Sequence, residues 1–186
     1  MDGYYDPIVT HVLSKPLALC GFWGASIPDI GAYISGYTGI SFVDLERKIE
    51  HHLGRSLKHY NSNKTKIIAV ERVSLEQLSR QTPYSVIALR PETLFDPKCA
   101  SIVQSVMNLV FVDVQPEQLQ KRLETLMQTQ KNNRFFELDD LDWRDLQEIT
   151  AYFSSYRQAF QIANHTIVPE KNHPRYAAHE VIDTCM

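Results

Sequence analysis

Hydrophobic residues along the chain fall into short runs, separated by longer segments in which apolar positions recur with helical spacing. This alternation is typical of strands buried on both faces of a parallel sheet and joined by crossover helices. We therefore predict an α/β fold with a mainly parallel central sheet. The predicted strands cover residues 17–20, 41–43, 85–89, 109–112 and 165–168.

The helical segments begin and end at residues with suitable capping chemistry. Gly54 follows the segment 45–53 as a C-terminal cap, and Pro174 opens the last helix. The other predicted helices cover 30–37, 97–106, 116–127 and 142–161. Residues 128–140 are largely polar and have the length and position of a mobile lid. The pattern predicts a single domain over 1–186, preceded by an N-terminal extension over 1–16.

Composition removes several classes of function. The chain has 186 residues, 44% of them hydrophobic, which is enough for a full core. A net charge of -3 with interspersed signs gives no basic patch, so neither nucleic acid nor a membrane surface is an expected partner. Three cysteines without paired spacing, and an acidic start instead of a secretory signal, indicate a reducing, cytoplasmic location.

The segment 21–31, Gly-Phe-Trp-Gly-Ala-Ser-Ile-Pro-Asp-Ile-Gly, has the layout of a nucleotide-binding P-loop without its chemistry. In the pattern G-x-x-x-x-G-K-[ST] the lysine reaches phosphate and the hydroxyl holds Mg²⁺. Here Ser26, Ile27 and Pro28 occupy the last three positions. We predict that Ser26 and Asp29 form a capping box, which places a carboxylate where phosphate would bind. The degenerate loop comprises Gly21, Gly24, Ala25, Ser26, Ile27, Pro28 and Asp29.

Other candidate sites have simpler explanations. His51 and His52 are adjacent on a helix, where side chains point about 100° apart, so they cannot chelate one metal ion together. Nothing marks a catalytic base beside Cys99 or Cys185, so ordinary packing explains both. The acidic residues near Asp142 suit the start of a helix. We therefore expect no metal site.

Several motifs, in order along the chain, resemble those of the shikimate kinase family. Residues 42–50, Phe-Val-Asp-Leu-Glu-Arg-Lys-Ile-Glu, followed by 53–56, Leu-Gly-Arg-Ser, look like the family's F-x-D-x-D-x-x-I-E and G-R-S. Gly21-Phe22-Trp23-Gly24 and Gly31 fit the same family, and the likeness runs from about Leu17 to about Val168. It implies a three-layer P-loop kinase fold, and an ATP- and Mg²⁺-dependent activity on shikimate.

The departures from the family lie at its substrate-binding positions. Asp44 is retained, whereas Glu46 replaces the second aspartate of D-x-D. Ile68 stands where the family has an arginine that binds the shikimate carboxylate, ahead of a retained Glu71. The family's triple glycine is replaced by 90–92, Arg-Pro-Glu. The resemblance also aligns Arg134 with the lid arginine and Arg157 with the late substrate-binding arginine.

These observations predict a protein that has lost phosphoryl transfer and acts as a binding or interaction module, without catalytic residues or cofactor. One alternative is an active small-molecule kinase with a remodelled site, which would need ATP and Mg²⁺. The other is a protein that keeps half of the pocket and binds an intermediate or nucleotide without turnover. The partner, a small molecule or a protein, is not identified by the sequence. We expect any ligand site on the acceptor side of the cleft, among Asp44, Glu46, Glu71, Arg90 and Glu92, unless Arg90 forms only an internal salt bridge.

Overall fold

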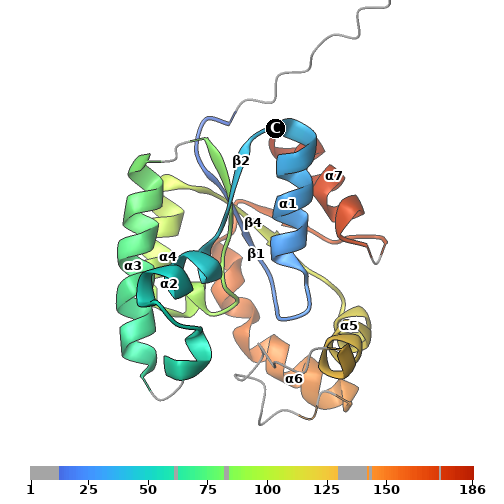
Figure 1. Cartoon of the computed structure of the whole chain (residues 1–186). Coiled ribbons are helices and arrows are strands. Elements are labelled where there is room, and N and C mark those ends of the chain that lie inside the picture. The colour runs from blue at the N-terminus through green and yellow to red at the C-terminus, as the bar shows by residue number, and fades with distance from the viewer. Residues whose placement is uncertain (1–12, 61–62, 82–83, 130–141, 143, 172) are drawn as a thin grey trace, which may run out of the picture.

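The fold is that of a computed structural model, which describes residues 13–60, 63–81, 84–129, 142, 144–171 and 173–186. Five strands form one sheet in the order β2-β3-β1-β4-β5, and every pair of neighbouring strands is parallel. Helices cover both faces, with α1 and α7 on one side and α3 and α4 on the other (Figure 1). The predicted three-layer α/β/α architecture with a parallel sheet is confirmed.

The strands are β1 (Leu17–Cys20), β2 (Ser41–Asp44), β3 (Ser85–Ala88), β4 (Asn108–Val112) and β5 (His165–Ile167). Their positions agree with the predicted strands, because short apolar segments are readily buried as strands inside a parallel sheet. All four residues of β1, the central strand, are fully buried. Its carboxyl end therefore opens at the middle of the sheet edge, where ligands of open α/β folds bind.

The helices are α1 (Ile27–Thr38), α2 (Leu45–Leu53), α3 (Lys64–Gln81), α4 (Pro97–Val106), α5 (Pro116–Thr129), α6 (Leu146–Tyr156) and α7 (Pro174–Cys185). Short 3-10 turns lie at η1 (Leu57–Tyr60), η2 (Thr93–Phe95) and η4 (Arg157–Ile162).

The helices differ from prediction in four places, one of which is that α5 extends to Thr129 and so includes the first two residues of the predicted lid. Helix α3 was not predicted at all, and α1 begins at Ile27 instead of residue 30. The predicted helix 142–161 is instead α6 followed by η4, because Asp145 and not Asp142 caps it: the Asp145 carboxylate accepts the amides of Gln147 and Glu148. The predicted lid lies outside the described residues from 130 onward, as does the N-terminal extension up to residue 12.

Helix α1 packs closely on the neighbouring strand because Gly31 has no side chain. A Cβ atom at Gly31 would lie 2.3 Å from Cε2 of Phe42, well inside van der Waals contact. The glycine and the phenylalanine that the motifs share with the shikimate kinase family are thus in direct contact. Their contact fixes where α1 begins relative to the carboxyl ends of β1 and β2.

Candidate functional site

The loop between β1 and α1 contains two residues with positive φ. Gly24 has φ +82°, and Ser26 has φ 59° and ψ 37°, the left-handed region. Ser26 is the one residue other than glycine with positive φ in the part of the chain that the structure describes. The next segment begins as a helix should, since the Ile30 amide donates to the Ser26 carbonyl at 3.0 Å.

The predicted capping box is wrong in one respect. Ser26 occupies the N-cap position, but its side chain makes no capping hydrogen bond. An N-cap side chain reaches the helix amides from an extended backbone, and the left-handed backbone of Ser26 does not direct it there. Asp29 is nevertheless in the first turn and exposed, so it does place a carboxylate at this helix start.

The side chains of Ile27 and Pro28 give the loop no donor for phosphate. Ile27 is 4% exposed and belongs to the hydrophobic core; its Cδ1 atom lies 2.8 Å from where a Cβ atom on Gly21 would be. Its side chain therefore packs under the loop. Pro28, in the first turn, has no amide hydrogen. The two neighbours Phe22 and Trp23 anchor the loop in an aromatic cluster, in which Phe22 stacks on Phe153 at 4.5 Å.

Arg122, which sequence reasoning did not identify, reaches the loop from α5. Its Nη1 donates to the Gly24 carbonyl at 3.1 Å. Partial burial lowers the pKa of Arg122, and the nearby negative charge of Asp29 opposes that shift. A positively charged group thus lies beside the loop, where it is hydrogen-bonded to the Gly24 carbonyl. The 98 residues that separate it from Gly24 in sequence explain why no local motif revealed it.

Four of the predicted acceptor-side residues lie around one cavity of about 170 Å³ at the carboxyl edge of the sheet. Asp44 ends β2 and caps α2: its Oδ1 accepts the Arg47 amide at 3.2 Å, and its Oδ2 lies 3.5 Å from Nε of Arg47. The opposite wall is the degenerate loop. The cavity is lined by Glu46, Arg90 and Glu92 together with Asp44, by loop residues that include Ser26, Ile27, Pro28 and Asp29, and by several apolar side chains.

Arg90 is the centre of a buried polar network. Its Nη1 donates to Oε2 of Glu71 at 3.2 Å, and its Nη2 donates to Oε2 of Glu92 at 3.1 Å. Thr93 donates from Oγ1 to the other oxygen of Glu71 at 2.6 Å. The Glu71 and Arg90 side chains are only 2% and 6% exposed. Burial raises the pKa of Glu71, and Arg90 and Thr93 partly offset that increase.

Arg90 and Glu92 also separate two hollows. Both residues line the cavity described above and a second cavity of about 270 Å³, whose other walls include Glu71, Ile68 and Lys64. The Oε1 atom of Glu92 is buried and has no hydrogen-bond partner among the described residues. The salt bridge predicted as one of two roles for Arg90 is therefore present, and it lies at the wall between the two cavities.

A second ion pair supports the same region from α3. Arg72 donates from Nε and Nη2 to the two Asp96 oxygens at 3.0 and 2.6 Å, while Asp96 accepts the Cys99 amide to cap α4. These hydrogen bonds hold the pKa of Asp96 well below its usual range. Arg72 and Thr93 were missed because both act through partners on elements that sequence patterns do not pair.

The remaining predicted residues lie elsewhere. Arg157 forms an ion pair with Asp113, just beyond β4, and neither lines the two cavities. Arg134 is outside the described residues. Burial raises the pKa of the Cys99 thiol to about 12, as expected for a packing residue.

Neither a metal centre nor a membrane span emerges from the described part of the chain. It contains no group of three or more histidine, cysteine, aspartate or glutamate side chains that could hold a metal ion. Its helices are all too short or too polar to cross a membrane.

Several solved structures share this fold. Shikimate kinase from Acinetobacter baumannii in complex with shikimate superposes with a TM-score of 0.77 at 17% identity, covering 94% of this chain and 93% of that one. Shikimate kinase from Bacteroides thetaiotaomicron gives 0.75 at 16% identity, with coverage of 91% and 95%. At such identities the likeness establishes the fold alone.

Sequence comparison adds the family. Shikimate kinases from Chlorobaculum tepidum and Prosthecochloris aestuarii are 28% and 29% identical over 108 and 107 residues. These matches cover 57% and 56% of this chain, and the chain spans only about half the length of these relatives, 56% and 54%. The family model for shikimate kinase matches residues 28–186, so its match begins at Pro28, near the end of the degenerate loop. The chain therefore belongs to the shikimate kinase family.

Proposed function

We propose that this protein is a catalytically inactive member of the family that acts as a binding or interaction module. The observation that carries the proposal is the orientation of Ile27, which packs into the core at the position where a P-loop needs a lysine over the phosphates. Pro28 has neither a hydroxyl group nor an amide hydrogen, and Asp29 places a negative charge where a triphosphate would lie. These residues do not fit Mg²⁺-bound ATP.

A coupled assay with shikimate and MgATP tests the inactivity directly. We expect no turnover above background, because each charged donor to a transferring phosphoryl group is worth several kcal/mol of transition-state stabilisation. Asp44→Ala is the matched control. Turnover that Asp44→Ala abolishes would contradict the proposal, whereas turnover that this variant leaves unchanged would come from a contaminating enzyme.

Reversal of the loop tests whether the missing side chains are the reason. The variant Ser26→Gly, Ile27→Lys, Pro28→Ser, Asp29→Thr restores the glycine, the lysine, the hydroxyl and a neutral first turn. Since Ser26 already has the left-handed backbone that glycine adopts readily, we expect the fold to persist and MgATP affinity to appear in calorimetry. A folded variant without affinity would show that the loop geometry differs from a working P-loop.

For the module itself, we propose the acceptor-side cavity as the ligand site. Asp44, Glu46, Arg90 and Glu92 line it, which gives a small hollow with charges of both signs. Thermal-shift titration with shikimate and related cyclic acids tests this, because a ligand at about 100 times its dissociation constant adds about 2.7 kcal/mol to the free energy of unfolding. The site would be supported if Glu92→Gln altered the shift in melting temperature that a ligand causes. Glu76→Gln, on the exposed side of α3, is the control and should leave that shift unchanged.

One observation favours the alternative of an active kinase. The guanidinium of Arg122 lies beside the loop and is its nearest candidate to replace the missing lysine. Under that alternative, turnover of a small hydroxylated acid would depend on ATP and Mg²⁺ and would be lost in Arg122→Gln. Under the inactive reading, Arg122→Gln only weakens the anchoring of the loop.

A further inference from the structure

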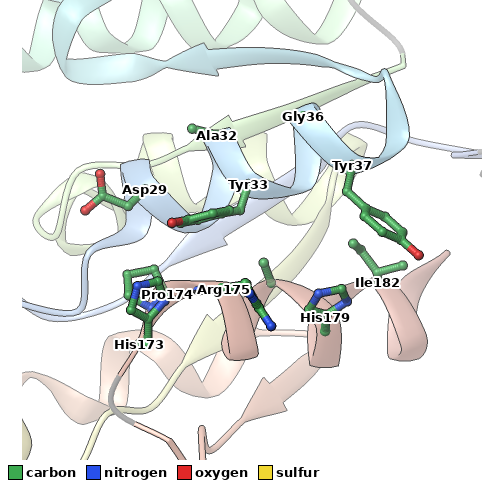
Figure 2. Close-up of a pocket in the computed structure, with 11 residues that line it drawn as sticks. Asp29, Ala32, Tyr33, Gly36, Tyr37, His173, Pro174, Arg175, His179 and Ile182 are labelled. Carbon is green, nitrogen blue, oxygen red and sulfur yellow. Dashed lines mark hydrogen bonds between the residues drawn. The ribbon is translucent and has the colours of Figure 1, made fainter.

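A second concave surface lies between α1 and α7, outside the cleft described above. It is a groove of about 620 Å³, within the range of small-molecule sites. Figure 2 shows side chains of the two helices facing each other across it. Asp29, at the start of α1, lines both the groove and the cleft. The groove therefore adjoins the cleft at Asp29, while its other lining residues are distinct from those of the cleft.

Three of the residues that line the groove are small: Ala32 and Gly36 on α1 and Ala178 on α7. Gly36 lies inside the helix, where glycine is less stable than alanine. Packing does not require it, because a Cβ atom there would meet no atom within 4 Å. Close approach of a bound molecule to the helix backbone is a use that glycine serves.

Aromatic rings form the walls. Tyr33 meets His173 edge to face at 5.9 Å between ring centroids, and Tyr37 meets His179 at 5.3 Å. The two tyrosines are 44% and 66% exposed, unusually high for side chains of this size. Rings arranged in this way present apolar surface to a flat ring placed between the two helices.

Arg175 supplies a positive charge. It lines the groove from α7 (Figure 2), and no carboxylate of the described residues forms an ion pair with it. Its nearest aromatic contact is with Tyr176, at 5.5 Å from Cζ to the ring centroid. His173 accepts the Arg175 amide at Nδ1, so in the neutral ring Nε2 carries the hydrogen and is a further donor. Asp29 is the one acidic residue among those that line the groove; in Figure 2 it lies at the same end as His173 and Pro174, and it is near Arg122.

We propose that this groove binds a flat aromatic carboxylate. The ring lies against Ala32, Gly36 and Ala178, and the carboxylate pairs with the Arg175 guanidinium, which suits such a planar anion. Tyr33 and Tyr37 enclose the ring. The proposed site does not depend on the function proposed for the cleft.

Benzoate is the probe that tests the proposal, with benzamide as its uncharged analogue and cyclohexanecarboxylate as its non-aromatic one. Backbone amide shifts of the full ¹⁵N-labelled chain report where each binds. We expect benzoate to give saturable shifts confined to α1 and α7 with a dissociation constant on the order of 1 mM, as befits a fragment. Benzamide and cyclohexanecarboxylate should bind about tenfold more weakly.

Two variants separate binding from folding. Gly36→Leu fills open space, so it should fold at least as stably as the wild type while abolishing the benzoate shifts. Arg175→Gln should weaken benzoate about tenfold and leave benzamide unchanged. Arg55→Gln, an exposed arginine beyond α2, is the matched control and should change neither. The proposal is overturned by equal affinity for benzoate and benzamide, by benzoate shifts that persist in Gly36→Leu or lie in the cleft, or by no saturable shift up to about 10 mM.

Discussion

Removal of the Arg90 charge tests how the buried network stabilises the protein. The Glu71 side chain is 2% exposed and accepts hydrogen bonds from Arg90 and Thr93. Arg90→Met removes the charged donor and keeps Thr93. Breaking a buried ion pair in this way lowers the free energy of unfolding by about 3 to 5 kcal/mol. For a chain of this length that corresponds to a decrease in melting temperature of roughly 6 to 20 °C.

The pH dependence identifies Glu71 as the cause. Burial raises the pKa of Glu71 above 4.5, so the folded state holds this proton more tightly than the unfolded state does. The contribution of protonated Glu71 to the free energy of unfolding is therefore present below pH 4.5, and it is lost as pH rises through the pKa of Glu71 in the folded state. Because Arg90 lowers the pKa of Glu71, that pKa is higher in Arg90→Met, and the loss of stability continues to a higher pH. The difference between wild type and Arg90→Met should accordingly widen as pH rises.

Urea denaturation at several pH values measures both effects. Arg90→Met combined with Glu71→Gln should recover about 1 to 3 kcal/mol, since no unpaired charge then remains at Glu71. Arg80→Met, at the exposed end of α3, is the matched control and should change the free energy of unfolding by about 0.5 kcal/mol or less. A loss below about 1 kcal/mol in Arg90→Met would refute the reasoning, because it would equal that of a surface ion pair.

Three further outcomes are expected. Gly31→Ala should lower the free energy of unfolding in urea by about 1 to 3 kcal/mol, because its methyl group meets the Phe42 ring, and by less in a Phe42→Leu background; equal losses in both would show that the ring is not the obstacle. The stability difference between wild type and Asp96→Asn should shrink as pH falls below 3.8, because Arg72 holds the pKa of Asp96 low and the contribution is lost on protonation; a difference independent of pH would point to the cap alone. Cys99, with a pKa of about 12, should resist iodoacetamide at pH 8 until the protein unfolds, as followed by mass spectrometry; rapid labelling of the native protein would contradict its burial.

The strands could be predicted from the sequence, whereas the longest helix could not. Each strand is a short apolar run bounded by polar or turn residues, which leaves little choice of structure. The buried face of α3 instead includes Glu71 and Ser74, which interrupt the hydrophobic periodicity. Glu71 is buried there because Arg90 and Thr93 satisfy it. Local spacing carries no information about partners that lie so far along the chain.

Four of the five residues predicted on the acceptor side line one cavity, but their hydrogen-bond partners were not predicted. The motifs predicted that these four charged residues lie at one edge of the sheet, and all four line the cavity: Asp44, Glu46, Arg90 and Glu92. The backbone of Ser26 was misread, since serine gives no sign that it adopts the left-handed conformation. Arg122 was missed because its contact with the loop is tertiary.

The residues that this chain shares with the shikimate kinase motifs are those that shape the cleft. Gly31 lets α1 contact Phe42, Gly24 turns the loop with positive φ, and Asp44 caps α2 at the end of β2. Ile27 packs into the core and Pro28 lies in the first turn of α1, where proline is well tolerated, so both residues are compatible with that shape. MgATP affinity measured before and after replacement of residues 26–29 is therefore the decisive comparison: affinity gained only by the folded variant would show that side-chain identity limits phosphate binding, whereas a folded variant without affinity would show that the loop backbone does.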